Sequence, residues 1–136
     1  MATLLRIDAK EAKRLVDMNK AVLIDVREKG EQARSWIPGA VLAPLSAIQS
    51  TNFNKDRKKT AIFFCATGSR TTMRSANLAS AGFRDARELA GGIRAWKNAG
   101  FEVAVDPNAP DPSKFLKLAA MGLLALALGA MLFLRG

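Results

Sequence analysis

Two apolar runs, at 21–26 and 60–65, stand out in the first hundred residues of the chain, the first broken only by Asp25 and the second opening on Thr60. Each is short, rich in branched or aromatic side chains and bounded by polar residues, which is typical of a strand buried on both faces of a parallel sheet. Weaker strand patterns occur at 4–7, 41–45 and 86–89. Together these segments predict a sheet built from about five short strands.

Helical spacing of apolar residues separates the expected strands. Asp8 and Glu11 have the spacing of a capping box and predict a helix start, with a buried face made by Ala12, Leu15, Val16 and Met18. The pattern predicts helices at 8–19, 28–35, 71–81 and 93–99. Strands that alternate with helices indicate an α/β domain with a mainly parallel sheet.

The last part of the chain follows a different pattern. Residues 118–134 carry no charge, and with Phe115, Leu116 and Lys117 they form a segment of about 20 residues, long enough as a helix to cross a bilayer. Three prolines at 106–113 predict a stiff linker before it. We therefore expect a domain at 1–105, a proline-rich linker at 106–113 and one transmembrane helix at 114–136.

Charges around the apolar segment predict its orientation. Lys114 and Lys117 precede it and Arg135 follows it, which favours a single-pass protein of the cell (inner) membrane with its N-terminal domain in the cytoplasm. A buried core helix is the alternative, but a domain this small has little room to surround one. A homo-oligomer is also open as a possibility, because small residues share one face of this segment, at Gly122, Ala125 and Gly129.

The composition of the chain excludes several kinds of catalytic and metal site. The chain has one cysteine and no histidine, which excludes an internal disulfide, a Cys₄ or Cys₂His₂ zinc site and a Cys–His dyad. Its formal net charge of +9 favours anionic partners, including lipid headgroups. We expect no nucleic-acid partner, because no pattern of base-stacking aromatic residues accompanies the charge.

The lone cysteine ends an apolar strand. After Cys65 come Ala66, Thr67, Gly68, Ser69 and Arg70, and then the expected helix. Backbone N–H groups in such a loop can turn inward and, with the start of the helix, stabilise a thiolate. Arg70 can bind a sulfonate group. The alternative is an inert, buried cysteine at a strand end.

Four motifs resemble those of the rhodanese family, in the family's order. They are L-I-D-V-R-E at 23–28, I-P-G-A at 37–40, C-A-T-G-S-R at 65–70 and L-A-G-G-I-R-A-W at 89–96, and the resemblance extends over about 4–104. Trp36 stands where the family usually has histidine, and Ala66 where it often has a charged or polar residue. The resemblance implies a rhodanese-like fold, a five-stranded mainly parallel sheet with helices on both faces.

The resemblance also implies a membrane-anchored sulfurtransferase of the thiosulfate sulfurtransferase type. Cys65 would take sulfane sulfur from thiosulfate or a similar donor, hold it as a persulfide and pass it to cyanide or a thiol, without cofactor or metal. A non-catalytic sulfane-sulfur carrier or sensor at the membrane is the alternative. The related phosphatases have a loop one residue longer. For Arg27 two roles stay open, an ion pair with Asp25 or contact with the donor anion.

Overall fold

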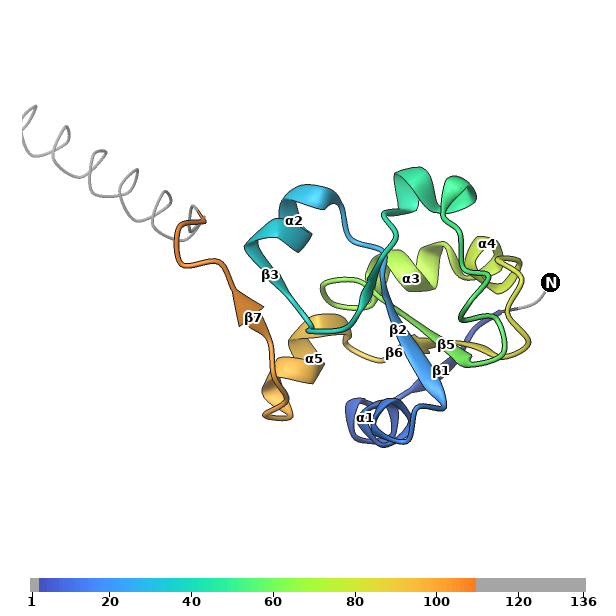
Figure 1. Ribbon diagram of the computed structural model, residues 1–136, viewed down its shortest axis with the longest axis horizontal. Coiled ribbons are helices and arrows are strands. Elements are labelled where there is room, and N and C mark those ends of the chain that lie inside the picture. The colour runs from blue at the N-terminus through green and yellow to red at the C-terminus, as the bar shows by residue number, and fades with distance from the viewer. Residues whose placement is uncertain (1–2, 110–136) are drawn as a thin grey trace, which may run out of the picture. The chain divides into compact units, whose positions relative to one another are not determined.

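The computed structural model describes residues 3–109, and the chain divides into one compact unit, Met1–Asp106, and a second, Pro107–Gly136. The first unit contains a five-stranded sheet in the order β1-β6-β5-β2-β4, in which every pair of neighbours is parallel (Figure 1). The five strands of this sheet are β1 (Leu5–Ile7), β2 (Ala21–Asp25), β4 (Val41–Leu42), β5 (Thr60–Phe64) and β6 (Ala86–Leu89). The predicted parallel sheet is confirmed.

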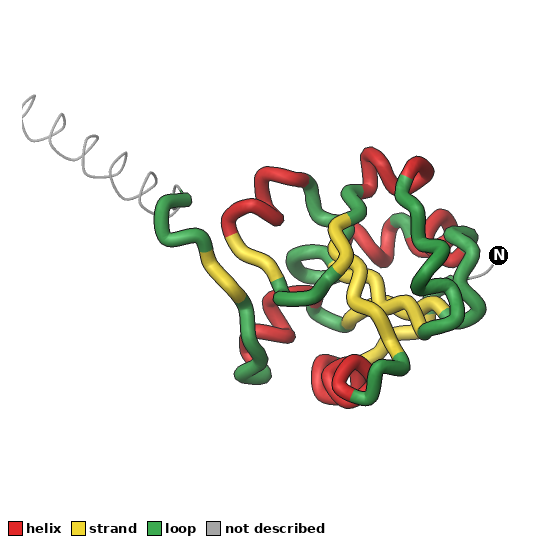
Figure 2. The backbone as a smooth tube through the Cα atoms, viewed as in Figure 1, coloured by secondary structure: helices red, strands yellow, loops and turns green. Residues whose placement is uncertain are grey.

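Helices cover both faces of the sheet, also as predicted (Figures 1 and 2). On one face, α1 and α5 contribute Ala12 and Trp96 to the core, and on the other, η1 and α4 contribute Ile48 and Leu78. The helices are α1 (Ala9–Asp17), α2 (Lys29–Arg34), the 3₁₀ helix η1 (Leu45–Ser50), α3 (Ser69–Met73), α4 (Ser75–Ala79) and α5 (Gly92–Asn98).

Strand β5 lies in the middle of the sheet, between β2 and β6. Its side chains alternate between the two cores, so that Ala61 and Phe63 belong to one, and Ile62 and Phe64 to the other. All four are 0% exposed, which explains the uninterrupted apolar run in the sequence. Cys65 continues the alternation just past the strand end and is packed in the first core.

The predicted helix at 71–81 is wrong in one respect, because it is divided into α3 and α4. The break falls at Arg74, whose φ of −105° and ψ of 17° leave the helical range. The Ser75 hydroxyl accepts the N–H of Leu4 at 2.7 Å, which ties the start of α4 to the chain before β1. This contact between distant residues is invisible in local spacing. Figure 2 shows the short helices in red.

Three smaller expectations also need correction. Met18 was expected in the buried face of the first helix, but its side chain is 49% exposed because α1 ends at Asp17. The segment 49–59 is not all loop, since η1 reaches Ser50. A two-stranded antiparallel ribbon, β3 (Ser35–Trp36) with β7 (Ala104–Val105), was not predicted.

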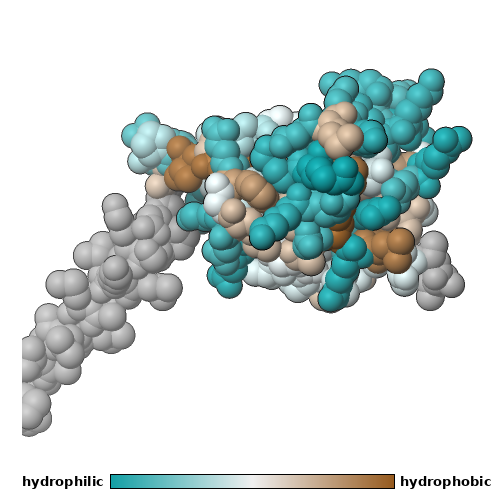
Figure 3. All heavy atoms as spheres, turned by 90° about the horizontal axis from the view of Figure 1, so that it is seen from below, coloured by the Kyte–Doolittle hydropathy of each residue, from teal (hydrophilic) through white to brown (hydrophobic). Residues whose placement is uncertain are grey.

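The surface seen in Figure 3 is mainly hydrophilic, with small separate apolar patches. None of the helices within residues 3–109 is long and apolar enough to cross a membrane. Residues 110–113 of the predicted linker lie outside the described residues, as does the predicted transmembrane helix with Gly122, Ala125 and Gly129. They stay predictions.

Candidate active site

The loop that follows β5 carries the lone thiol at the carboxyl edge of the sheet. Cys65 is 0% exposed, and the chain turns after it through Gly68, whose φ is +97°. Glycine adopts this left-handed conformation without strain, and here it lets the loop close tightly before α3. The Cys65 sulfur therefore lies beneath its own loop.

Hydrogen-bond donors of the loop surround the sulfur. The N–H of Gly68 donates to Cys65 Sγ at 3.1 Å, and Thr71 Oγ1 lies 3.9 Å from the same atom. Burial alone raises the pKa of the Cys65 thiol. Donation from the N–H groups of Thr71, Gly68 and Arg70 and from the Thr71 hydroxyl outweighs burial, so that the net pKa lies below its ordinary value.

The source of this stabilisation differs from the sequence expectation in one respect. Helix α3 has only five residues, so its macrodipole is weak, and the individual N–H groups of the loop are the main donors. The Thr71 hydroxyl has one hydrogen, shared between the Cys65 sulfur and the carbonyl of Gly68, to which it donates at 3.0 Å. That bond closes the loop over the sulfur.

Backbone hydrogen bonds join α5 to the active-site loop. The N–H of Ile93 donates to the carbonyl of Cys65 at 2.9 Å, and the N–H of Arg94 donates to the carbonyl of Ala66 at 3.2 Å. Gly92 makes this approach close, because a Cβ atom there would lie 2.4 Å from the Cys65 carbonyl oxygen. The backbone at the nucleophile is thus fixed to a second element.

Arg70 holds the other end of the loop. Its guanidinium makes two hydrogen bonds to the Glu31 carboxylate, at 2.7 and 2.8 Å. These bonds hold the pKa of Glu31 below its ordinary range. Glu31, and to a smaller degree Cys65, raise the pKa of Arg70, so its guanidinium lies between α2 and the thiol. Binding of a donor anion by Arg70 stays a prediction.

Glu31 is the residue of the site that sequence reasoning missed. It lies 39 positions before Arg70, and its carboxylate also accepts the N–H of Glu28 at 2.9 Å, within a capping box at the start of α2. The Glu28–Glu31 spacing was the available signal. It indicates a helix start but not a contact with the loop.

Arg27 takes the first of the two roles left open for it. Its guanidinium donates to Asp25 Oδ2 at 2.7 Å and to the carbonyl of Ser35 at 2.7 Å. Arg27 is 4% exposed and Asp25 0% exposed, and a pair buried to this degree needs such complete bonding. The structure places Arg27 as a brace between the end of β2 and the start of β3.

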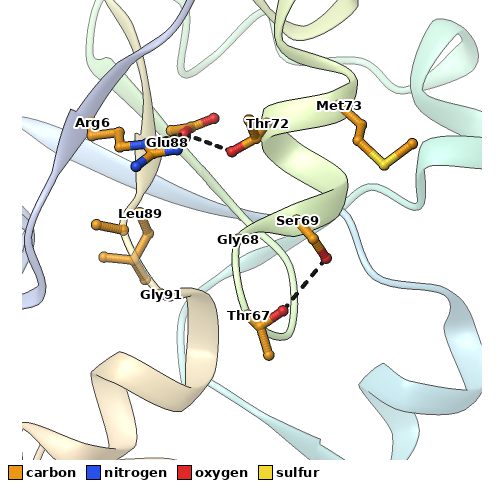
Figure 4. A pocket seen from close by; sticks show the side chains of 10 residues that line it. Arg6, Thr67, Gly68, Ser69, Thr72, Met73, Glu88, Leu89 and Gly91 are labelled. Carbon is orange, nitrogen blue, oxygen red and sulfur yellow. Dashed lines mark hydrogen bonds and ion pairs between the residues drawn. The ribbon is translucent and has the colours of Figure 1, made fainter.

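The exposed side of the loop borders a hollow of about 460 Å³ (Figure 4). Thr67 and Ser69 lie at its rim with their hydroxyl oxygens 3.5 Å apart. At its far end Glu88 accepts hydrogen bonds from Arg6 at 2.9 Å and from Thr72 at 3.0 Å. These bonds join β1, β6 and α3.

The Arg70–Glu31 contact leads to a first prediction. Changing Glu31 to Gln keeps an oxygen for the Glu28 N–H but removes the charge that holds Arg70, so the loop end is less firmly fixed. Because exposed ion pairs contribute about 1 kcal/mol or less, we expect little loss of stability. We expect the rate of any reaction at Cys65 to fall about three- to tenfold.

Glu11→Gln is the matched control, since Glu11 pairs with Arg14 on α1 at 2.6 and 2.9 Å and does not touch the loop. Alkylation of the thiol by iodoacetamide, together with urea denaturation, measures both effects. Equal alkylation rates in Glu31→Gln, Glu11→Gln and wild type would show that Glu31 does not support the loop.

Comparison with known proteins agrees with this geometry. The family model described as the rhodanese-like domain matches residues 8–99. An uncharacterized protein of Synechocystis sp., slr1261, is 32% identical over 104 residues, which cover 76% of this chain and 58% of that protein. A sulfurtransferase of Allochromatium vinosum is 32% identical over 94 residues, covering 68% of this chain and 86% of the relative.

Solved structures show the same fold. A rhodanese-like domain protein from Staphylococcus aureus superposes with a TM-score of 0.61 at 29% identity, and the alignment covers 76% of this chain and 99% of that one. The match to slr1261 spans less than two thirds of that relative. The likeness therefore concerns the domain that carries Cys65.

Proposed function

Since the chain belongs to the rhodanese-like domain family, with sulfurtransferases among its relatives, we propose that it transfers sulfane sulfur through a persulfide on Cys65. The single observation that carries this proposal is the cluster of N–H donors around the Cys65 sulfur, which lowers the pKa of the thiol. A thiolate is the form of cysteine that attacks sulfur. The same donors suit a persulfide anion.

The reaction proceeds in two displacements. The Cys65 thiolate attacks the outer sulfur of thiosulfate, the S–S bond of thiosulfate breaks, and sulfite leaves with the bonding electron pair. In the second step a thiolate or cyanide attacks the outer sulfur of the Cys65 persulfide, and the thiolate is restored. Because the chain has one cysteine, no internal thiol can remove the sulfur, and the acceptor comes from outside.

Burial of the thiol fits the reactivity of the intermediate. Cys65 has no exposed surface, while Thr67 and Ser69 in the loop above it are exposed. A donor therefore reaches the sulfur only when the loop moves aside. Once the loop recloses, the persulfide is shielded from water and from unselective reaction with other nucleophiles.

Membrane attachment is the second part of the proposal. It is supported by the uncharged apolar stretch at 118–134 and the lysines at 114 and 117. The protein then presents Cys65 on the cytoplasmic side of the inner membrane. Carbonate extraction of cell membranes tests this part. The full chain should stay in the membrane pellet, and a variant ending at Asp106 should not.

A turnover assay tests the sulfur transfer. With thiosulfate and excess cyanide or thiol, the full chain should release sulfite continuously, many equivalents per protein. Loading of Cys65 with one sulfur atom but without further turnover would overturn catalysis and favour the carrier or sensor. Absence of both sulfite and persulfide would remove thiosulfate as the donor.

A further inference from the structure

We propose that the hollow between the active-site loop and α5 binds the anionic end of the sulfur donor through Arg94 and Lys97. This inference rests on the proposed function and deepens it, because it names the residues that bind the anionic end of the donor. The donor would be a small molecule with a sulfonate or similar anion at one end and a transferable sulfur at the other. Neither the family match nor the relatives assign these two residues a role.

The hollow lies beside the loop that follows the nucleophile. It has a volume of about 220 Å³, enough for an anion of a few heavy atoms, and it is lined by Ala66 and Thr67, the two residues that follow Cys65. Ser35 and Val105 of the β3–β7 ribbon form the opposite side. Arg94 and Lys97 are the charged residues of the lining, and it contains no acidic residue.

Both cations are available to a ligand. Arg94 and Lys97 are exposed, lie three positions apart on one face of α5, and make no side-chain hydrogen bond or ion pair within residues 3–109. The two arginines that the sequence offered for this role are both occupied, Arg27 by Asp25 and Arg70 by Glu31. The available positive charge beside the loop therefore comes from α5.

The backbone of α5, which carries these cations, is fixed to the active-site loop. Backbone bonds from Ile93 and Arg94 to the carbonyls of Cys65 and Ala66 join α5 to the loop at its first two residues. In Figure 4, α5 begins after Gly91, next to the part of the loop that carries Thr67. An anion held by Arg94 and Lys97 thus lies close to the residues that cover Cys65.

Another free cation suits this role less well. Arg74 lines a different hollow, of about 390 Å³, but Glu28 lines that hollow too, and its carboxylate weakens anion binding there. The loop residue in that hollow is Arg70, which is five positions after Cys65 and already paired. Arg74 therefore serves as a control.

The experiment compares two alkylating reagents of nearly equal size on the full chain, anionic iodoacetate and neutral iodoacetamide. Both report on the sole thiol and neither needs sulfur transfer. The quantity compared is the rate constant for iodoacetate divided by that for iodoacetamide. This ratio should fall about fivefold in the double variant Arg94→Gln/Lys97→Gln, because two positive charges near the loop attract only the anionic reagent. The KM for thiosulfate should rise by a similar factor.

Two controls remove charge elsewhere. Lys55→Gln/Lys58→Gln makes the same change in net charge, but these residues precede β5, at the other end of the strand from Cys65. Arg74→Gln removes the exposed cation that lines the hollow of about 390 Å³. Neither control should change the ratio of rate constants.

The outcomes separate this proposal from the function on which it rests. Suppose that the ratio falls in the α5 variant but in neither control, while the wild-type protein releases no sulfite from thiosulfate. That outcome would keep the anion site and overturn thiosulfate as the donor. Sulfite release with an unchanged ratio in the α5 variant would overturn the anion site and keep the sulfurtransferase. An equal fall in either control would also overturn the site.

Discussion

Replacing Cys65 with serine should abolish sulfur transfer and leave the fold intact. The variant cannot form a persulfide, and a serine hydroxyl is not ionised near neutral pH, so the rate should fall by about a thousandfold or more. Serine is close to cysteine in size, and its oxygen can accept the Gly68 N–H that the sulfur accepts at 3.1 Å. We expect the change in stability to stay within about 1–2 kcal/mol.

Sulfite release and urea denaturation of the same preparations check this expectation. Ser80→Ala is a matched control, because the Ser80 hydroxyl bonds the carbonyl of Asn77 on α4, away from the loop. Sulfur transfer by Cys65→Ser at more than a few per cent of the wild-type rate would mean that a group other than this thiol carries the sulfur.

Gly92→Ala is expected to have the largest effect on stability. A Cβ atom at Gly92 would lie 2.4 Å from the carbonyl oxygen of Cys65 and 2.7 Å from backbone atoms of Ala66, and the φ of +61° already disfavours alanine. Backbone atoms cannot rotate away, so the loop or α5 has to move. We expect a loss of about 3 kcal/mol or more, together with loss of sulfur transfer.

Gly39→Ala is the control that separates the backbone strain of a positive φ from the steric clash expected in Gly92→Ala. Gly39 also has a positive φ, of +84°, but nothing lies within 4 Å of the Cβ position. This variant should lose about 1–2 kcal/mol through strain alone and keep its activity. Urea denaturation measures both variants. Equal losses in both would mean that α5 and the loop are not packed as closely as described.

The sequence contained most of the fold because its signals are local. Buried strands such as β5 need continuous apolar runs. The Asp8 side chain caps α1 by accepting the N–H of Glu11 at 2.8 Å, but the Glu11 carboxylate pairs with Arg14, so only half of the predicted capping box forms. The place of Cys65 follows from the same logic, since it comes directly after an apolar strand and before a tight, glycine-containing loop.

Local patterns could not predict the contacts between residues that lie far apart in the sequence. Glu31 meets Arg70 across 39 positions, and Ser75 accepts the N–H of Leu4 across 71. The β3–β7 ribbon has two residues in each strand, too few for an alternating pattern. The Arg70–Glu31 pair was not predicted for this reason, because its two members meet only once the chain is folded.

The pH dependence of thiol ionisation tests the central claim, which is that the loop holds Cys65 as a thiolate. A donor-stabilised thiolate in the folded state moves the ionisation midpoint to lower pH, and unfolding in urea should return it to the ordinary value. We predict a midpoint of alkylation by iodoacetamide clearly below about 8.5 in the native protein. A native midpoint at or above the value found in urea would contradict the mechanism.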